Sequence, residues 1–284
     1  MTILLSGATG KIGRHVVDNL LAAGKDVRAL SRRPDRAGLP PEVTVVEGDL
    51  TVPESLTAAL DGVESAFLFP VLEAIPDFVA SAKRAGVQRI VLFTGAWAAG
   101  HTERDIGSWV YPRYRAAEAA LESSGVAQWT ILRPAPFQTN MLWWASSVRA
   151  ESVVRAPYPA ATCPLIHEAD IAAVAALALT EDGHHGARYT LTGPAAVSQT
   201  EQVAAISGAI GREIRFEELT ADQWRESTGK FLRPGIVGDL LREWSETAAD
   251  PSCALPVLTT VEELTGKRPR SVDEWAADHA ADFA

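Results

Sequence analysis

The residues best suited to chemistry stand near the start of the chain, in a run rich in glycine. Gly7-Ala8-Thr9-Gly10-Lys11-Ile12-Gly13 follows a short apolar stretch and opens a helical pattern. Glycines allow a tight turn, and free N–H groups at a helix start can bind the diphosphate of a dinucleotide. A glycine-rich turn without a ligand is the alternative, but a preceding strand and a following helix are the context that this fingerprint requires. The predicted cofactor residues here are Gly7, Thr9, Gly10, Lys11, Ile12 and Gly13.

The choice of dinucleotide is made at the end of the second predicted strand, 26–31. NAD-binding proteins usually place a carboxylate there, whereas this chain has Ser31-Arg32-Arg33. A guanidinium binds the extra phosphate of NADP in a bidentate manner, so NADPH is the predicted cofactor. The alternative is that both arginines belong to a solvated turn.

Two further dipeptides follow later strands and complete the predicted cofactor site. Asp49-Leu50 follows strand 43–47, where Asp49 would either accept a hydrogen bond from the adenine amino group or cap the helix that starts at Pro53. Phe69 is the last residue of strand 65–69, and Pro70 follows it. Both dipeptides fall at the carboxyl ends of strands, where open α/β sheets bind ligands.

Strands and helices alternate through the first half of the chain, which predicts a Rossmann-type α/β fold with a parallel sheet and helices on both faces. The predicted strands are 2–6, 26–31, 43–47, 65–69, 88–94 and 128–133, and the helices between them are 10–23, 53–60, 75–85 and 112–123. We expect residues 1–134 to form the NADP-binding domain and 135–284 a smaller substrate-binding subdomain, with 187–192 returning to the sheet. Residues 134–165, rich in proline, are predicted to be irregular.

Composition narrows the class of protein. The formal net charge of −10 disfavours nucleic acid as a partner. Cys163 and Cys253 form neither a CxxC motif nor a disulfide framework. The first apolar run is too short for a signal peptide or a membrane span, so we expect a cytoplasmic protein without a membrane partner.

Several segments together resemble the NmrA-like branch of the atypical short-chain dehydrogenases/reductases, including its quinone and azo reductase-like members. The matching segments are 7–13, 82–91, 125–134 and 189–194. The resemblance implies the fold and a reductase activity but says little about the substrate. Together with the arginines and the tryptophans, it predicts an NADPH-dependent reductase of a hydrophobic, aromatic ketone or quinone, for example a metabolite of the polyketide type. The family also contains regulators, so a non-catalytic NADP(H) sensor is the alternative, and a sugar-nucleotide epimerase is a weaker one.

In catalytic relatives, a tyrosine with a lysine four residues later donates a proton, assisted by a hydroxyl after the fifth strand. The resemblance places Tyr111, Arg115 and Thr94 at these positions. Arginine replaces the lysine, and Pro112 would leave Tyr111 at the helix cap. Two hypotheses follow: Tyr111 is the general acid, or solvent or the substrate supplies the proton while the protein only positions the reactants.

Aromatic residues after the strands suggest an aromatic substrate. The predicted substrate contacts are Trp97, Trp109, Phe137, Trp143 and Trp144, although tryptophans more often pack in a core. Trp129, Trp224, Trp244 and Trp275 fall in helical or strand patterns and are predicted to be structural. His167 near Asp170 invites a metal interpretation, but Asp170 fits a helix start better, so no metal is predicted. The chain is expected to act as a monomer or homodimer.

Overall fold

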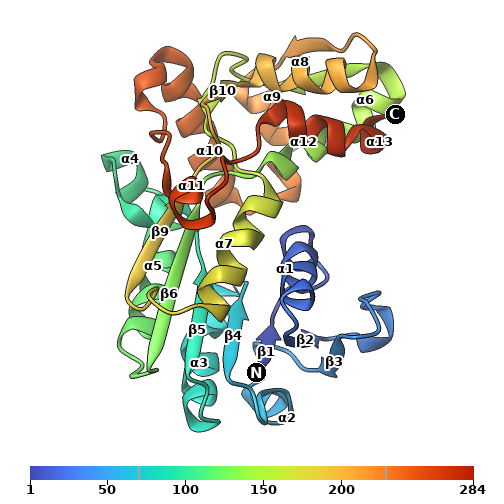
Figure 1. Ribbon diagram of the computed structural model, residues 1–284. Helices are drawn as coiled ribbons and strands as arrows, with labels where there is room; N and C mark the ends of the chain where they lie inside the picture. Colours follow the sequence, from blue (N-terminus) through green and yellow to red (C-terminus); the bar gives the residue numbers. More distant parts are fainter. Residues whose placement is uncertain (70, 228) are drawn as a thin grey trace.

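The computed structural model describes residues 1–69, 71–227 and 229–284. At its centre is a parallel sheet of seven strands (Figure 1). In spatial order the strands are β3 (Thr44–Glu47), β2 (Asp26–Ser31), β1 (Thr2–Leu5), β4 (Ser65–Leu68), β5 (Arg89–Phe93), β6 (Gln128–Pro134) and β9 (Ala187–Leu191). The strand order reverses between β1 and β4, which opens a ligand crevice at their carboxyl ends. The Rossmann-type fold predicted from the sequence is confirmed.

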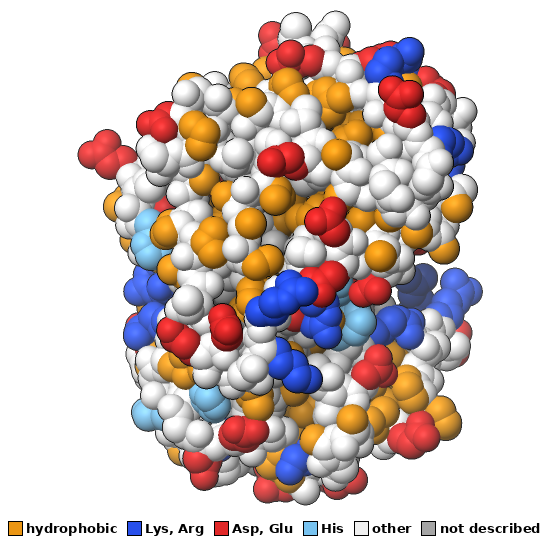
Figure 2. All heavy atoms as spheres, turned by 45° about the horizontal axis from the view of Figure 1, so that its top comes forward, with side chains coloured by type: hydrophobic (Ala, Val, Ile, Leu, Met, Phe, Trp, Pro, Cys, Tyr) orange, Lys and Arg blue, Asp and Glu red, His pale blue; other side chains and the backbone are white. Residues whose placement is uncertain are grey.

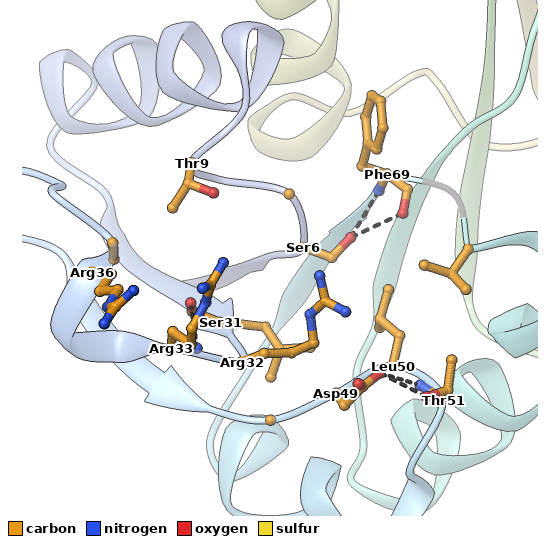
Figure 3. Close-up of a pocket in the computed structure, with 15 residues that line it drawn as sticks. Ser6, Thr9, Ser31, Arg32, Arg33, Arg36, Asp49, Leu50, Thr51 and Phe69 are labelled. Atoms are coloured by element: carbon orange, nitrogen blue, oxygen red, sulfur yellow. Dashed lines mark hydrogen bonds between the residues drawn. The ribbon is translucent and has the colours of Figure 1, made fainter. Parts of the chain in front are cut away.

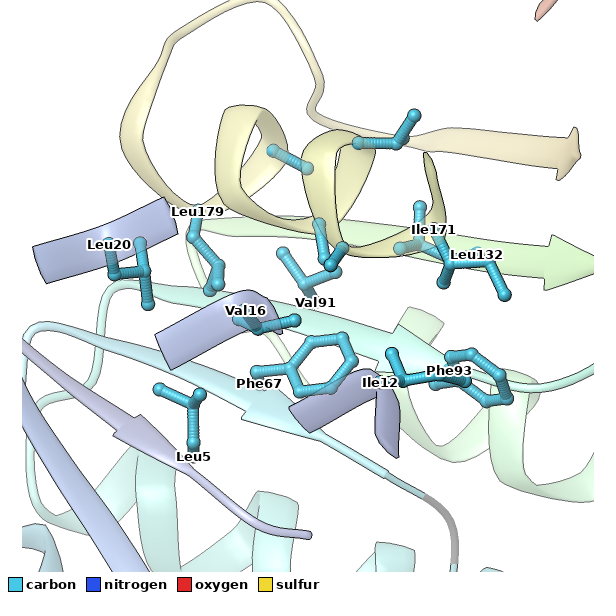
Figure 4. Packing of buried hydrophobic residues seen from close by; sticks show 14 of the residues in the cluster. Leu5, Ile12, Val16, Leu20, Phe67, Val91, Phe93, Leu132, Ile171 and Leu179 are labelled. Carbon is cyan, nitrogen blue, oxygen red and sulfur yellow. The ribbon is translucent and has the colours of Figure 1, made fainter. Parts of the chain in front are cut away.

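Helices cover both faces of this sheet, as expected for parallel strands that are buried on both sides. In β1, Ile3 and Leu5 belong to one core cluster and Leu4 to the other, because successive side chains of a strand point to opposite faces. The first face carries α1 (Lys11–Ala22), α7 (Glu168–Thr180) and α11 (Thr260–Thr265), and the second carries α2 (Leu56–Leu60), α3 (Ile75–Arg84) and α5 (Tyr111–Glu122). Figure 4 shows the first core, where Val16 of α1 lies next to Phe67 and Ile171 of α7 lies next to Leu132.

The rest of the chain forms the upper part of Figure 1 and has cores of its own. Its helices are α6 (Ala145–Glu151), α8 (Gln199–Ile210), α9 (Ala221–Ser227), α10 (Pro234–Ala249), α12 (Val272–Asp278) and α13 (Ala280–Phe283). A short parallel pair joins β7 (Val153–Ala156) to β11 (Arg215–Glu218), and an antiparallel pair joins β8 (Thr162–Cys163) to β10 (Val197–Ser198). Fully buried Trp275 packs in the larger of these cores.

The prediction that residues 134–165 are irregular is wrong. They contain the 3-10 helix η5 (Gln138–Trp144), the helix α6 and the strands β7 and β8. Both strands pair with partners from beyond residue 190, so their hydrogen bonds come from distant segments that local patterns do not reveal.

The first turns of α11 and α12 differ in how their side chains cap the helix. Ser271 accepts a hydrogen bond from the Glu274 backbone N–H at 3.2 Å as part of a capping box that starts α12. Thr260 and Glu263 have the same spacing but form no box, because Thr260 is already helical and Thr259 is the N-cap of α11. Thr259 instead donates its hydroxyl to Glu263 at 2.6 Å.

Charged side chains of both signs are interspersed with hydrophobic ones on the face that Figure 2 shows. Within the described ranges, none of the helices combines the length and the apolar composition needed to cross a bilayer.

Candidate active site

The turn between β1 and α1 has the shape that a bound diphosphate requires. Gly7 adopts φ +68°, and its carbonyl oxygen accepts a hydrogen bond from Gly10 at 3.0 Å. A Cβ atom on Gly13 would lie 2.1 Å from the Gly7 oxygen, so this position admits only glycine. Helix α1 begins with neither a side-chain cap nor an acidic residue in its first turn. Its first N–H groups and the positive end of its dipole are therefore available to an anion.

Three arginines surround a cavity of about 410 Å³ beside this turn. Arg32 and Arg33 follow β2, and in Figure 3 both guanidinium groups point toward the turn that carries Thr9. The backbone N–H of Arg33 donates to the Ser31 hydroxyl at 3.1 Å, which fixes the chain at the strand end. Arg36 lines the same cavity and was missed by the sequence prediction. Its signal was present, since it is the third arginine within five residues.

Asp49 and Leu50, which follow β3, also line this cavity. The Asp49 carboxylate accepts from the Thr51 backbone N–H at 2.9 Å and from its hydroxyl at 2.8 Å. These hydrogen bonds, and then the Arg32 charge, hold the pKa of Asp49 below its usual range. The capping alternative is not formed, because the 3-10 helix η2 (Pro53–Ser55) has Val52 at its N-cap and no side-chain cap.

An aromatic row continues from the turn across the ends of β4, β5 and β6. The Phe69 ring lies 4.9 Å from Phe93, whose ring lies 5.8 Å from Phe137. Ser6 ties β1 to this row, because its hydroxyl accepts from the Phe69 backbone N–H at 2.8 Å. Pro70, predicted beside Phe69, lies outside the described residues.

Two of the residues predicted to be catalytic meet at a buried carboxylate that the sequence prediction missed. Glu118 is fully buried on α5 and accepts hydrogen bonds from Arg133 of β6 at 2.9 Å and from the Thr94 hydroxyl at 2.9 Å. Arg115 also binds this carboxylate. A buried carboxyl group needs such partners to satisfy its oxygen atoms. Thr94 and Arg115 therefore point their polar groups at Glu118.

The two tyrosines at the start of α5 lie in different places. Tyr111 is the first helical residue rather than the cap, and a Cβ atom on Gly100 would lie 3.1 Å from its ring. Tyr114, which the sequence prediction did not include, packs on the end of β5, where a Cβ atom on Gly95 would lie 3.0 Å from its ring. Burial raises the pKa of Tyr114 to about 12. Tyr114 fills the space that a larger residue at 95 would occupy.

Tryptophans gather at a hollow beyond the aromatic row. Trp143, which is 42% exposed, and Trp144 line it together with Trp224 and Trp244. The last two were predicted to be structural, and their rings pack edge to face 4.9 Å apart while also bordering the hollow. Trp97 borders a neighbouring hollow.

Trp109 has a different setting. The Arg113 guanidinium lies 3.7 Å from its ring centroid, and a Cβ atom on Gly235 would lie 2.2 Å from the ring. It is thus packed between α5 and α10.

The histidine near the start of α7 serves the helix. His167 is its N-cap and accepts from the Ala169 backbone N–H at 3.0 Å, while Asp170 binds Arg270. In the part of the chain that the structure describes, no group of three or more His, Cys, Asp or Glu side chains is arranged to hold a metal ion.

Comparisons with known proteins agree with this geometry. A family model described as NAD(P)H-binding matches residues 7–182, which include the glycine turn, the arginines and Glu118. The chain is 38% identical to the (4-alkanoyl-5-oxo-2,5-dihydrofuran-3-yl)methyl phosphate reductase of Streptomyces griseus, over 99% of both chains. It is 35% identical to the NAD(P)H azoreductase of Xenophilus azovorans, also over 99% of both.

A solved structure extends the similarity to the whole fold. An NADPH-dependent quinone oxidoreductase from Escherichia coli superposes with a TM-score of 0.79 at 25% identity, covering 97% of this chain and 98% of that one. The chain therefore belongs to the NAD(P)H-binding family, as its resemblance to the NmrA-like reductases predicted.

Proposed function

We propose that this protein is an NADPH-dependent reductase of a hydrophobic, conjugated substrate such as an aromatic ketone or a quinone. The observation that carries the proposal is the group of three arginines around the cavity next to the glycine turn. A carboxylate in their place would repel the 2′-phosphate of NADP, whereas guanidinium groups bind it with charge-assisted hydrogen bonds.

The cofactor and the substrate would be bound by two different regions of the chain. Residues 1–134 would hold the cofactor, with the turn at 7–13 on the diphosphate and Arg32, Arg33 and Arg36 on the 2′-phosphate. Residues 135–284 would supply most of the substrate pocket. NADPH, when bound, supplies a hydride from its nicotinamide ring. The aromatic row from Phe69 to Phe137 would exclude water from the reacting groups.

The names of the relatives support a conjugated acceptor. A dihydrofuranone bearing an alkanoyl group, an azo compound and a quinone each contain an electron-accepting double bond in a π system. The four tryptophans at the hollow offer flat apolar surfaces to such a molecule.

Thr94 and Arg115 are proposed to hold Glu118 rather than to transfer a proton. Their hydrogen bonds to this carboxylate support a structural role for both. With Arg115 engaged there, the positioning hypothesis, in which the proton comes from solvent or substrate, is favoured over Tyr111 as the acid.

The test replaces Arg32 and Arg33 together by alanine and measures the dissociation constants of NADPH and NADH by calorimetry. We expect the variant to bind NADPH about a hundredfold more weakly, with NADH unchanged, because two charge-assisted contacts to phosphate are lost. Arg225→Ala, which removes a half-exposed arginine on α9, is the control and should change neither constant. Tighter binding of NADH than NADPH by the unmodified protein would contradict the proposal.

Turnover is measured separately, as NADPH oxidation with a panel of quinones and aromatic ketones. Oxidation supports the reductase. Tight NADPH binding without oxidation on the whole panel would support the sensor instead.

A further inference from the structure

A buried acid borders both hollows on the substrate side. Glu243, in the middle of α10, is only 5% exposed. It lines the tryptophan hollow, of about 60 Å³, and also the neighbouring one, of about 30 Å³, which contains Trp97. Pro136, directly after β6, borders both as well. Each hollow has room for only one end of a ligand. Glu243 is the acid that borders both hollows, and Asp105 borders the smaller one as well.

The charges around Glu243 do not balance. Arg104 of α4 (Glu103–Ile106) lies 3.9 Å from the Glu243 carboxyl, which is longer than a hydrogen bond. The same guanidinium lies 3.1 Å from Glu246 and 3.7 Å from Asp105. One cation thus faces three acids, and Glu243 has the longest of the three distances. His101 is a further titratable side chain that lines the smaller hollow.

Burial raises the pKa of Glu243 to about 7, although Arg104 and the Trp97 indole N–H lower it. The charges of Asp105 and Glu246 add to the increase. Cys163 of β8 faces the same space, and burial together with the Glu243 charge raises the pKa of its thiol. A carboxyl in such surroundings holds its proton near neutral pH, since its charged form is neither hydrated nor well paired.

We propose that Glu243 is a specificity-determining residue that, as a neutral carboxylic acid, donates a hydrogen bond to a carbonyl or hydroxyl oxygen of the aromatic substrate. The proposal rests on the reductase function, because it takes the hollows as the place where the substrate binds. It also restricts the substrate class. A neutral oxygen at the inner end of the ligand is accepted, whereas a phosphate or carboxylate at that end is disfavoured by the charge of Asp105, which lines the smaller hollow.

The first test uses naphthoquinone as the probe, with the protein saturated with NADP⁺ so that no turnover occurs. Calorimetry should give a dissociation constant about tenfold larger at about pH 8 than at about pH 6, because the donor proton is lost across this interval. Glu243→Gln keeps an N–H donor and no longer titrates, so its affinity should be the same at both pH values. Naphthalene, which lacks oxygen, should bind without pH dependence.

Glu246→Gln is the matched control. It removes a carboxylate on the same helix that pairs with Arg104 but borders neither hollow, so the pH dependence of quinone binding should persist. Quinone binding that is absent at both pH values, or equal at both, would overturn the proposal. NADPH binding and oxidation are measured independently, so the reductase assignment can survive that outcome.

The second test needs no ligand. A pKa raised in the folded state means that folding takes up a proton, so stability falls as pH rises from the unfolded value near 4.5 to about 7. The melting temperature of the wild type relative to Glu243→Gln should therefore fall by several degrees over this interval. A constant difference would show that Glu243 is ionised throughout, and the proposal would fail.

Discussion

The glycine turn and the tryptophan hollow differ in how far apart in the chain their residues lie. The turn and its arginines come from β1, α1 and the end of β2, all within the first 36 residues. The hollow is lined from η5, β8, α8, α9 and α10, which spread over more than a hundred residues.

This difference separates two kinds of geometry. The turn depends on local backbone rules, such as the positive φ of Gly7 and the close approach at Gly13. The hollow depends on how distant helices pack. Substitutions should therefore act sharply and locally at the turn, and through the packing of several elements at the hollow.

The largest effect is expected at the turn. Gly13→Ala would place a methyl group 2.1 Å from the Gly7 oxygen, and that oxygen belongs to the backbone and cannot turn aside. The N–H groups that face the diphosphate would shift with it. We expect NADPH affinity, measured by calorimetry, to fall by more than about a hundredfold.

Gly208→Ala in α8 is the matched control on the other side of the comparison. A Cβ atom there meets nothing within 4 Å, and the helix gains about 0.5–1 kcal/mol of stability when glycine is replaced by alanine. NADPH affinity should not change. Equal losses of NADPH affinity in the Gly13→Ala and Gly208→Ala variants would contradict the distinction between a site shaped by the local backbone and one shaped by helix packing.

The same distinction explains what could be predicted from the sequence. The strand, turn and helix at residues 2–22 were found because hydrophobic patterning and glycine spacing are local signals. The pairing of β7 with β11 and the meeting of Trp143, Trp144, Trp224 and Trp244 were not, since no local pattern encodes them. Glu118 and Glu243 were missed for a related reason. A glutamate in a helical pattern is expected to be exposed, and its buried partners come from distant parts of the chain.

Glu118 does not fit this division into local and packed sites. It lies in the predicted cofactor-binding region, yet its partners come from the end of β5, from α5 and from β6. Glu118→Gln would leave the Arg133 guanidinium, 11% exposed, without its charge partner. We expect the free energy of unfolding, from urea titration, to fall by about 3 kcal/mol. NADPH affinity should change far less than in the Gly13 variant.

Glu122→Gln supplies the control on the same helix. Glu122 pairs with Arg188 at 2.7 Å, but both side chains are partly exposed, so the loss should stay below about 1 kcal/mol. If both glutamine variants lost equal stability, the buried network around Glu118 would not have the role assigned to it.

The smallest effect is expected at Tyr111, the first residue of α5, whose ring lies near Gly100. A tyrosine that acts as general acid contributes about two to four orders of magnitude to the rate. A cation beside the phenol favours that role because it stabilises the tyrosinate that forms, and the residue four positions later, Arg115, binds Glu118 instead. Tyr111→Phe should therefore lower kcat for NADPH oxidation less than tenfold, with Tyr114→Phe as the control for loss of a hydroxyl on the same helix. A drop in kcat of about a hundredfold or more, confined to the Tyr111 variant, would show instead that the Tyr111 phenol donates the proton.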